Sequence, residues 1–115
     1  MDISLSREAD LLLCHIYSAY LKKRSEGVPK SDARSFGGSK DLVPLVSFMI
    51  FEDIDSTCRE LAGAELLTIS YADNICNLIC LSDAGIVYME NRFGNQLLSV
   101  LDNIHKLVSV LNPFA

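Results

Sequence analysis

A short hairpin placed between helical segments is the feature that most constrains this chain. Residues 66–71 and 75–81 are rich in branched and aromatic side chains, which favours two β-strands. Asp73 and Asn74 lie between them, and both residue types tolerate the positive φ of a tight turn. The two strands are therefore expected to pair with each other in antiparallel fashion.

Helices are predicted on both sides of this hairpin. Apolar residues recur at helical spacing over residues 52–62, just before the first strand. After the second strand, Ser82 is an N-cap residue for a helix that ends or bends at Gly94. A final helix then runs to about Leu111, where the following Asn112 and Pro113 terminate it.

The N-terminal part is also helical. Apolar residues at spacings of three and four over residues 6–24 predict an amphipathic helix, which Gly27 helps to end. Residues 30–39 contain glycines and serines and predict a loop with one short helical turn. A further helix is expected to begin at Ser39, and Pro44 should shorten or kink it.

These elements predict one mainly helical α+β domain. The chain has 115 residues, half of them apolar, which is enough for a single hydrophobic core. Its apolar runs are far shorter than the roughly 20 residues that cross a bilayer. The N-terminus also lacks the basic and apolar regions of a secretory signal. We therefore expect a cytoplasmic protein with no membrane partner.

The cysteines and histidines do not form a pattern typical of metal binding or catalysis. Zinc ligands usually come in close pairs on turns, whereas these cysteines lie within predicted helices or a strand. We interpret them as reduced thiols in the core, namely Cys14, Cys58, Cys76 and Cys80. His15 and His105 are isolated on two different helices, and neither belongs to a sequence-visible Cys, Ser or carboxylate constellation that would make it a catalytic base. The sequence predicts neither an enzyme nor a metal or cofactor site.

The order helix, helix, helix, hairpin, helix over residues 6–91 resembles the winged helix-turn-helix superfamily, in particular small bacterial winged-helix proteins. Arg59-Glu60-Leu61 with the following Leu66-Leu67 carries the resemblance, and so does the stretch Leu81-Ser82-Asp83-Ala84-Gly85-Ile86 that returns into a helix. The chain departs from the pattern at Glu65, where such proteins commonly have glycine. Because Gly63 comes two residues earlier, we expect the third helix to end sooner.

The resemblance implies a winged-helix domain over residues 1–93, with three N-terminal helices and the hairpin as the wing. In the family, the third helix, here residues 52–62, enters the major groove of DNA and the wing tip touches the backbone. Charge argues against this role, because that helix has four acidic residues against Arg59 alone, a net charge of −3. The whole chain has a net charge of −5, which also disfavours contact with phosphates.

Basic residues are concentrated in a different part of the sequence. Residues 22–40 have a net charge of +4, whereas residues 41–115 have a net charge of −7. Candidate contacts to the DNA backbone come from this basic segment, with one more from the third helix: Lys22, Lys23, Lys30, Arg34, Lys40 and Arg59. The alternative is that these cations cap a helix and solvate a loop.

The C-terminal segment, residues 94–115, is predicted to join two copies of the chain while packing on its own domain. Its apolar residues alternate at spacings of four and three, as in a short heptad seam: Leu97, Leu101, Ile104, Val108 and Leu111. Further apolar residues flank the seam, so the helix needs burial by more than one surface. The alternative is that the whole helix packs inside one monomer.

Two functions follow from these observations as hypotheses. The first is a homodimeric winged-helix transcriptional regulator that binds DNA without metal or cofactor. The alternative is a winged-helix module that binds a protein partner through the acidic third helix and does not bind DNA.

Overall fold

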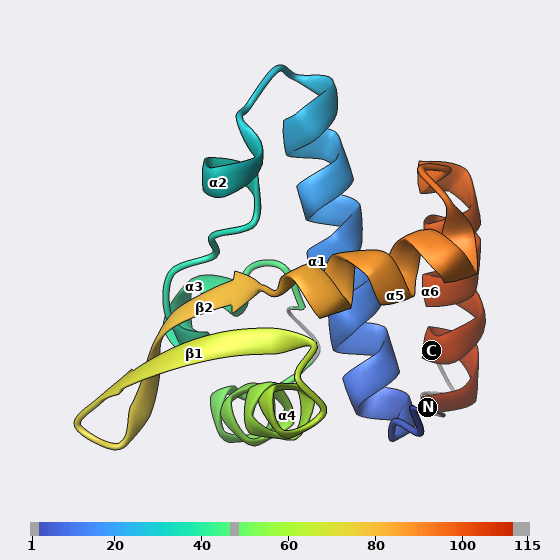
Figure 1. Cartoon of the computed structure of the whole chain (residues 1–115). Helices are drawn as coiled ribbons and strands as arrows, with labels where there is room; N and C mark the ends of the chain where they lie inside the picture. Colours follow the sequence, from blue (N-terminus) through green and yellow to red (C-terminus); the bar gives the residue numbers. More distant parts are fainter. Residues whose placement is uncertain (1–2, 47–48, 112–115) are drawn as a thin grey trace.

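The computed structural model describes residues 3–46 and 49–111. In this part of the chain a long central helix, α1, is surrounded by the other elements (Figure 1). The elements are α1 (Arg7–Ser25), α2 (Lys30–Ala33), α3 (Ser39–Leu42), α4 (Phe51–Gly63), β1 (Leu67–Ala72), β2 (Ile75–Leu81), α5 (Asp83–Phe93) and α6 (Leu97–Leu111). The prediction of a mainly helical α+β fold with an antiparallel hairpin is confirmed.

Helix α1 is capped by Ser6, whose Oγ accepts a hydrogen bond from the N–H of Ala9 at 3.1 Å. Leu11, Leu12 and Leu13 are consecutive and have no exposed surface. Three consecutive buried residues point in different directions around a helix, so α1 is enclosed on several sides. The expectation of a simple amphipathic helix is therefore wrong, because α4 and α6 both pack against α1.

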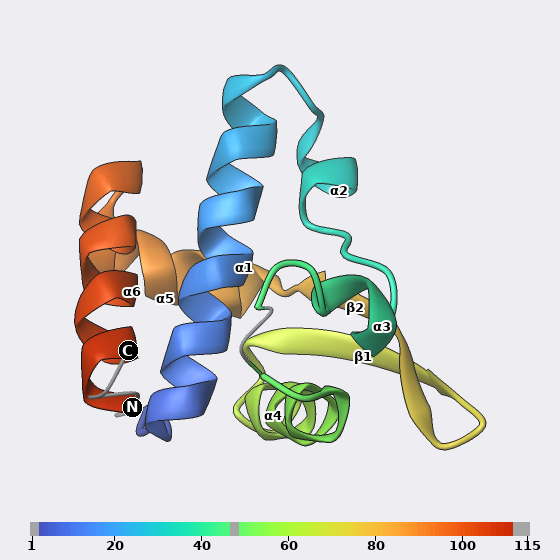
Figure 2. The same ribbon diagram turned by 180° about the vertical axis from the view of Figure 1, so that it is seen from behind.

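The segment after α1 contains two short helices, on the side of α1 opposite to α6 (Figure 2). Helix α2 is the short turn expected in this loop, and α3 begins at Ser39 as predicted. Helix α3 ends at Leu42, two residues before Pro44, which agrees with the expected shortening by that proline. Val46 still contributes a buried side chain to the core.

Three backbone hydrogen bonds connect the end of this loop to β2. The N–H of Phe36 donates to the carbonyl of Ile79 at 2.9 Å, and the N–H of Ile79 donates to the carbonyl of Gly37 at 2.7 Å. The N–H of Leu81 donates to the carbonyl of Arg34 at 2.8 Å. Residues 34–37 therefore run antiparallel to β2, and Ser35 and Cys80 form an isolated β-bridge within the predicted loop.

The turn of the hairpin has the predicted conformation, because Asp73 and Asn74 have φ values of 53° and 61°. Before the hairpin, α4 ends at Gly63, and Glu65 takes the left-handed conformation with φ of 65°. Glu65 therefore adopts the left-handed conformation for which glycine was expected at this position. The hairpin extends away from α1, beyond α3 and α4 (Figure 1).

Helices α5 and α6 complete the core. Ser82 caps α5 as predicted, since its Oγ accepts from the N–H of Gly85 at 2.9 Å. Gly94 ends α5 with φ of 61°, and its carbonyl accepts a hydrogen bond from the Tyr17 hydroxyl at 2.7 Å. Helix α6 then packs along α1. Among the described residues, no helix has the length and apolar character that crossing a membrane requires.

Candidate functional site

The best-organised polar cluster lies where α3, α4 and the hairpin meet. The carboxylate of Asp55 on α4 accepts hydrogen bonds from the Ser39 hydroxyl at 2.7 Å and from the Cys76 N–H at 3.0 Å. Its second oxygen accepts from Nε of Arg59 at 2.9 Å. One acidic side chain therefore links the start of α3, the middle of α4 and the start of β2.

This arrangement keeps Asp55 ionised. Burial opposes its charge, but the hydrogen bonds from Cys76, Ser39 and Arg59 outweigh this effect and hold the pKa of the carboxyl well below its usual range. In the sequence, Asp55 is visible only as one negative charge on the third helix, four residues before Arg59. Its bonds to Ser39 and Cys76 join distant positions, so the sequence carried no signal of this linking role.

Arg59, a predicted DNA contact, is held against the hairpin turn. Its guanidinium donates to the carbonyl of Asn74 at 2.6 Å, in addition to its bond with Asp55. The same group lies 4.8 Å from the ring centroid of Tyr71, which is a cation–π contact. Two of its five N–H donors are thus used within the chain, in fixing the turn to α4.

The exposed surface of α4 and the hairpin turn, which we call the α4–turn face, is acidic. Glu52 and Asp53 lie exposed in the first turn of α4, and Asp73 is exposed at the hairpin turn. Glu60 is also exposed but accepts from the N–H and hydroxyl of Ser6 at 3.0 and 2.9 Å. With Arg59 engaged, the unpaired charges of α4 itself are negative, whereas Lys40 on α3 lines a cleft beside the hairpin together with Asp73.

Three of the other predicted DNA contacts are also engaged within the chain. Lys23 donates to the carbonyl of Ser35 at 3.1 Å, and its Nζ lies 4.1 Å from the centroid of the Phe36 ring. Arg34 donates to the carbonyl of Leu81 at 2.8 Å and to Asp83 at 2.6 Å. Lys30 lies 3.8 Å from the same Asp83 carboxylate. These contacts join α1, residues 34–36 and the start of α5.

Lys22 and Lys40 are exposed, and their ammonium groups make no salt bridge or hydrogen bond with the described residues. They lie on different parts of the molecule: Lys22 at the C-terminal end of α1, and Lys40 on α3 beside the hairpin (Figure 1). The structure therefore does not bring the six predicted cations together. It places Lys22, Lys23, Lys30 and Arg34 near the end of α1 and α2, and Lys40 and Arg59 near the hairpin.

The residues of the predicted seam of α6 differ in how far they are buried. Ile104 is buried against the core together with Val100, whereas Leu97 and Val108 are half-buried. Leu101 is 36% exposed, and Leu98, which was predicted only to flank the seam, is 82% exposed. The Leu111 side chain lies outside the described residues. Ile104 is therefore covered within its own chain and offers little surface to a second copy.

The cysteines are free. Cys14, Cys58 and Cys76 are buried as predicted, but Cys80 is only half-buried, and its Sγ lies 3.5 Å from the Ser35 hydroxyl. Burial raises the pKa of both Cys14 and Cys58 to about 12, which disfavours the reactive thiolate. Within the described part of the chain, no group of three or more His, Cys, Asp or Glu side chains is arranged to hold a metal ion.

Comparison with known proteins does not place this chain in a family. No protein-family model, curated protein or solved structure shows a significant match to it.

Proposed function

We propose that this chain is a winged-helix module that acts through protein contacts, with the acidic α4–turn face as its docking surface for a basic partner. The observation that carries the proposal is the state of α4: Glu52 and Asp53 are exposed, whereas its single cation, Arg59, is bound to Asp55 and Asn74.

The order of elements supports the winged-helix part of this proposal. In sequence order, α1, α2, α3 and α4 precede β1 and β2, and residues 34–37 lie between α2 and α3. These residues pair with β2 through an isolated β-bridge between Ser35 and Cys80, and β2 also pairs with β1. A winged-helix domain would have such a pairing beside its helix-turn-helix, with the hairpin as the wing. The left-handed Glu65 between α4 and β1 fits the same pattern.

Charge supports a protein partner over DNA. Association with duplex DNA depends on cations that neutralise phosphates, so an acidic face is repelled by it. The same face attracts a partner that presents lysine and arginine residues. This module is proposed to work in the cytoplasm as a homodimer, with the exposed apolar side of α6 as the contact between copies.

DNA binding is the second candidate function. It is favoured by the exposed Lys22 near the end of α1 and Lys40 beside the hairpin, which make no salt bridge or hydrogen bond with the described residues, and by Lys30, which is exposed although it lies 3.8 Å from Asp83. In this case the phosphate contacts come from the α1–α2 end, not from α4. The protein would then act as a transcriptional regulator.

A titration of fluorescent duplex DNA separates the two functions. At ~50 mM salt, a condition that strengthens phosphate contacts, the first proposal expects no salt-dependent rise in anisotropy for the wild type. If the wild type instead binds DNA in a salt-dependent way, and Lys22→Gln or Lys30→Gln weakens that binding, the protein-docking proposal is contradicted and the DNA-binding candidate is supported.

Partner capture gives the complementary test. A protein captured by the wild type should be lost with the charge reversal Asp53→Lys on α4 and kept with Glu26→Lys at the exposed end of α1. The two substitutions change the net charge equally, so a loss with both would reflect overall charge and would contradict docking at the α4–turn face.

A further inference from the structure

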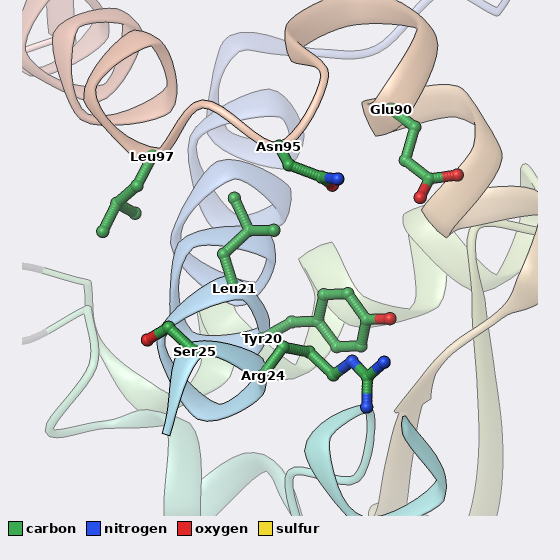
Figure 3. A pocket seen from close by; sticks show the side chains of 7 residues that line it. All are labelled: Tyr20, Leu21, Arg24, Ser25, Glu90, Asn95 and Leu97. Carbon is green, nitrogen blue, oxygen red and sulfur yellow. The ribbon is translucent and has the colours of Figure 1, made fainter. Parts of the chain in front are cut away.

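A cleft of about 440 Å³ lies between α1 and the end of α5, away from the α4–turn face. Tyr20, Leu21 and Arg24 line it from α1, and Glu90 lines it from α5. Leu97, at the start of α6, closes another side. Figure 3 shows these side chains around a common space. Because they come from separate helices, no sequence motif brings them together.

Two opposite charges line this cleft. Arg24 and Glu90 are exposed, and neither forms a salt bridge with a described residue. Arg24 is anchored by a hydrogen bond from its guanidinium to the carbonyl of Val28 at 3.1 Å, which leaves other donors of the group for a ligand. In Figure 3 both side chains extend toward the same side of the cleft, with the Tyr20 hydroxyl between them.

The other walls are apolar or neutral. Leu21 and Leu97 offer aliphatic surface, and the Asn95 side chain offers both a donor and an acceptor. Tyr20 is almost fully buried, so its ring forms a fixed part of the cleft wall. The volume falls within the range of small-molecule sites, about 300 to 1,000 Å³, and leaves room for a ligand of amino-acid or dipeptide size.

We propose that this cleft binds a small zwitterion with an aliphatic side chain, such as a free amino acid. Arg24 binds its carboxylate, Glu90 binds its ammonium group, and Leu21 and Leu97 contact its side chain. A ligand with only one of the two charges would leave the other cleft charge without a partner. The two charged side chains therefore determine the ligand class, and the leucines favour an apolar substituent.

Calorimetric titration of the full chain with free amino acids tests this assignment. At ligand concentrations up to about 10 mM, at least one aliphatic amino acid should bind. For leucine, isoamylamine lacks the carboxylate and 4-methylpentanoate lacks the ammonium group, and each analogue should bind at least about fivefold more weakly. Absence of binding by every aliphatic amino acid, or equal binding of the two analogues and leucine, would overturn the proposal.

Two variants assign the charges within the cleft. Arg24→Gln should remove the preference of the protein for leucine over isoamylamine. Glu90→Gln should remove the preference of the protein for leucine over 4-methylpentanoate. Arg7→Gln and Glu26→Gln make the same charge changes at exposed residues that do not line the cleft, and they should leave both preferences unchanged. Preferences that survive both cleft variants would place any binding elsewhere and overturn the proposal.

Discussion

The backbone N–H of Cys76 donates a hydrogen bond to the Asp55 carboxylate at 3.0 Å, and this contact joins the start of β2 to the middle of α4. The remaining oxygen of Asp55 accepts from Arg59, which in turn donates to the Asn74 carbonyl in the hairpin turn. Asp55 and Arg59 together fix the position of the hairpin relative to α4. The shape of the α4–turn face therefore depends on one largely buried carboxylate.

Replacement of Asp55 is expected to be strongly destabilising. Asp55→Ala leaves the Cys76 N–H without its acceptor and leaves the Ser39 hydroxyl with only the Cys76 carbonyl, at 3.5 Å, and both groups lie at buried residues. We expect a loss of about 2 to 4 kcal/mol in the free energy of unfolding, measured by urea denaturation. Asp53→Ala removes an equal charge from an exposed position in the same helix, and its effect should stay below about 1 kcal/mol.

The same carboxylate should contribute to acid sensitivity. Its pKa in the folded state lies below that of the unfolded chain, about 3.9, so the unfolded state takes up the proton first as the pH falls. The stabilisation by Asp55 is therefore complete above about pH 5 and decreases as the pH falls toward the folded-state pKa. Unfolding free energies measured from pH 6 to pH 2 should fall more steeply for the wild type than for Asp55→Asn. Asp53→Asn should retain the wild-type slope.

Local sequence signals predicted most of the secondary structure. Ser82, the pair Asp73 and Asn74, and Pro44 each act on their immediate neighbours, so their effects are visible in the sequence. The pairing of residues 34–37 with β2 could not be predicted, because it exists only through hydrogen bonds to residues more than forty positions away. The amphipathic interpretation of α1 failed for a similar reason, since only the tertiary structure shows that several helices enclose it.

A close contact makes Gly85 essential to the start of α5. A Cβ atom at this position would lie 2.2 Å from the carbonyl oxygen of Leu66, which belongs to the backbone and cannot move aside cheaply. Gly85→Ala should therefore lower the free energy of unfolding by about 2 to 4 kcal/mol. Gly63→Ala provides the matched control, because nothing lies within 4 Å of its Cβ position. It should be neutral or stabilise α4 by up to about 1 kcal/mol. Similar losses in both variants would contradict the packing seen at Gly85.

Thiol reactivity should differ among the cysteines. Cys80 is half-buried, whereas Cys14, Cys58 and Cys76 are buried, and burial raises the pKa of these three thiols. Under native conditions an aromatic disulfide reagent should therefore modify Cys80 first, and Cys80→Ser should remove this fast phase. All four thiols should react together in urea. A fast phase that persists in Cys80→Ser would show that one of the other cysteines is more accessible than the structure indicates.

The candidate sites were less predictable than the fold. Composition identified the acidic third helix correctly, but it could not show that Asp55 and Arg59 are used internally while Glu52 and Asp53 remain exposed. The net charge of the basic segment likewise could not show that Lys23 and Arg34 hold neighbouring segments together. Charge counts identify which elements carry a charge, and only the packed structure shows which of those charges remain accessible.

The proposed dimer requires residues on the outer side of α6. Leu98 is 82% exposed and Leu101 is 36% exposed, so neither is covered by its own domain as Ile104 is. The wild type should sediment as a dimer at about 50 μM, since a stable homodimer buries such an apolar face. Leu98→Asp and Leu101→Asp should produce monomers with unchanged circular dichroism, whereas Ser99→Asp on an adjacent exposed position should remain dimeric.

Ile104→Asp places a charge against α1 and should instead unfold the domain. A wild type that remains monomeric at about 100 μM would exclude α6 as the contact between copies, because an obligate interface of this kind is expected to associate below that concentration.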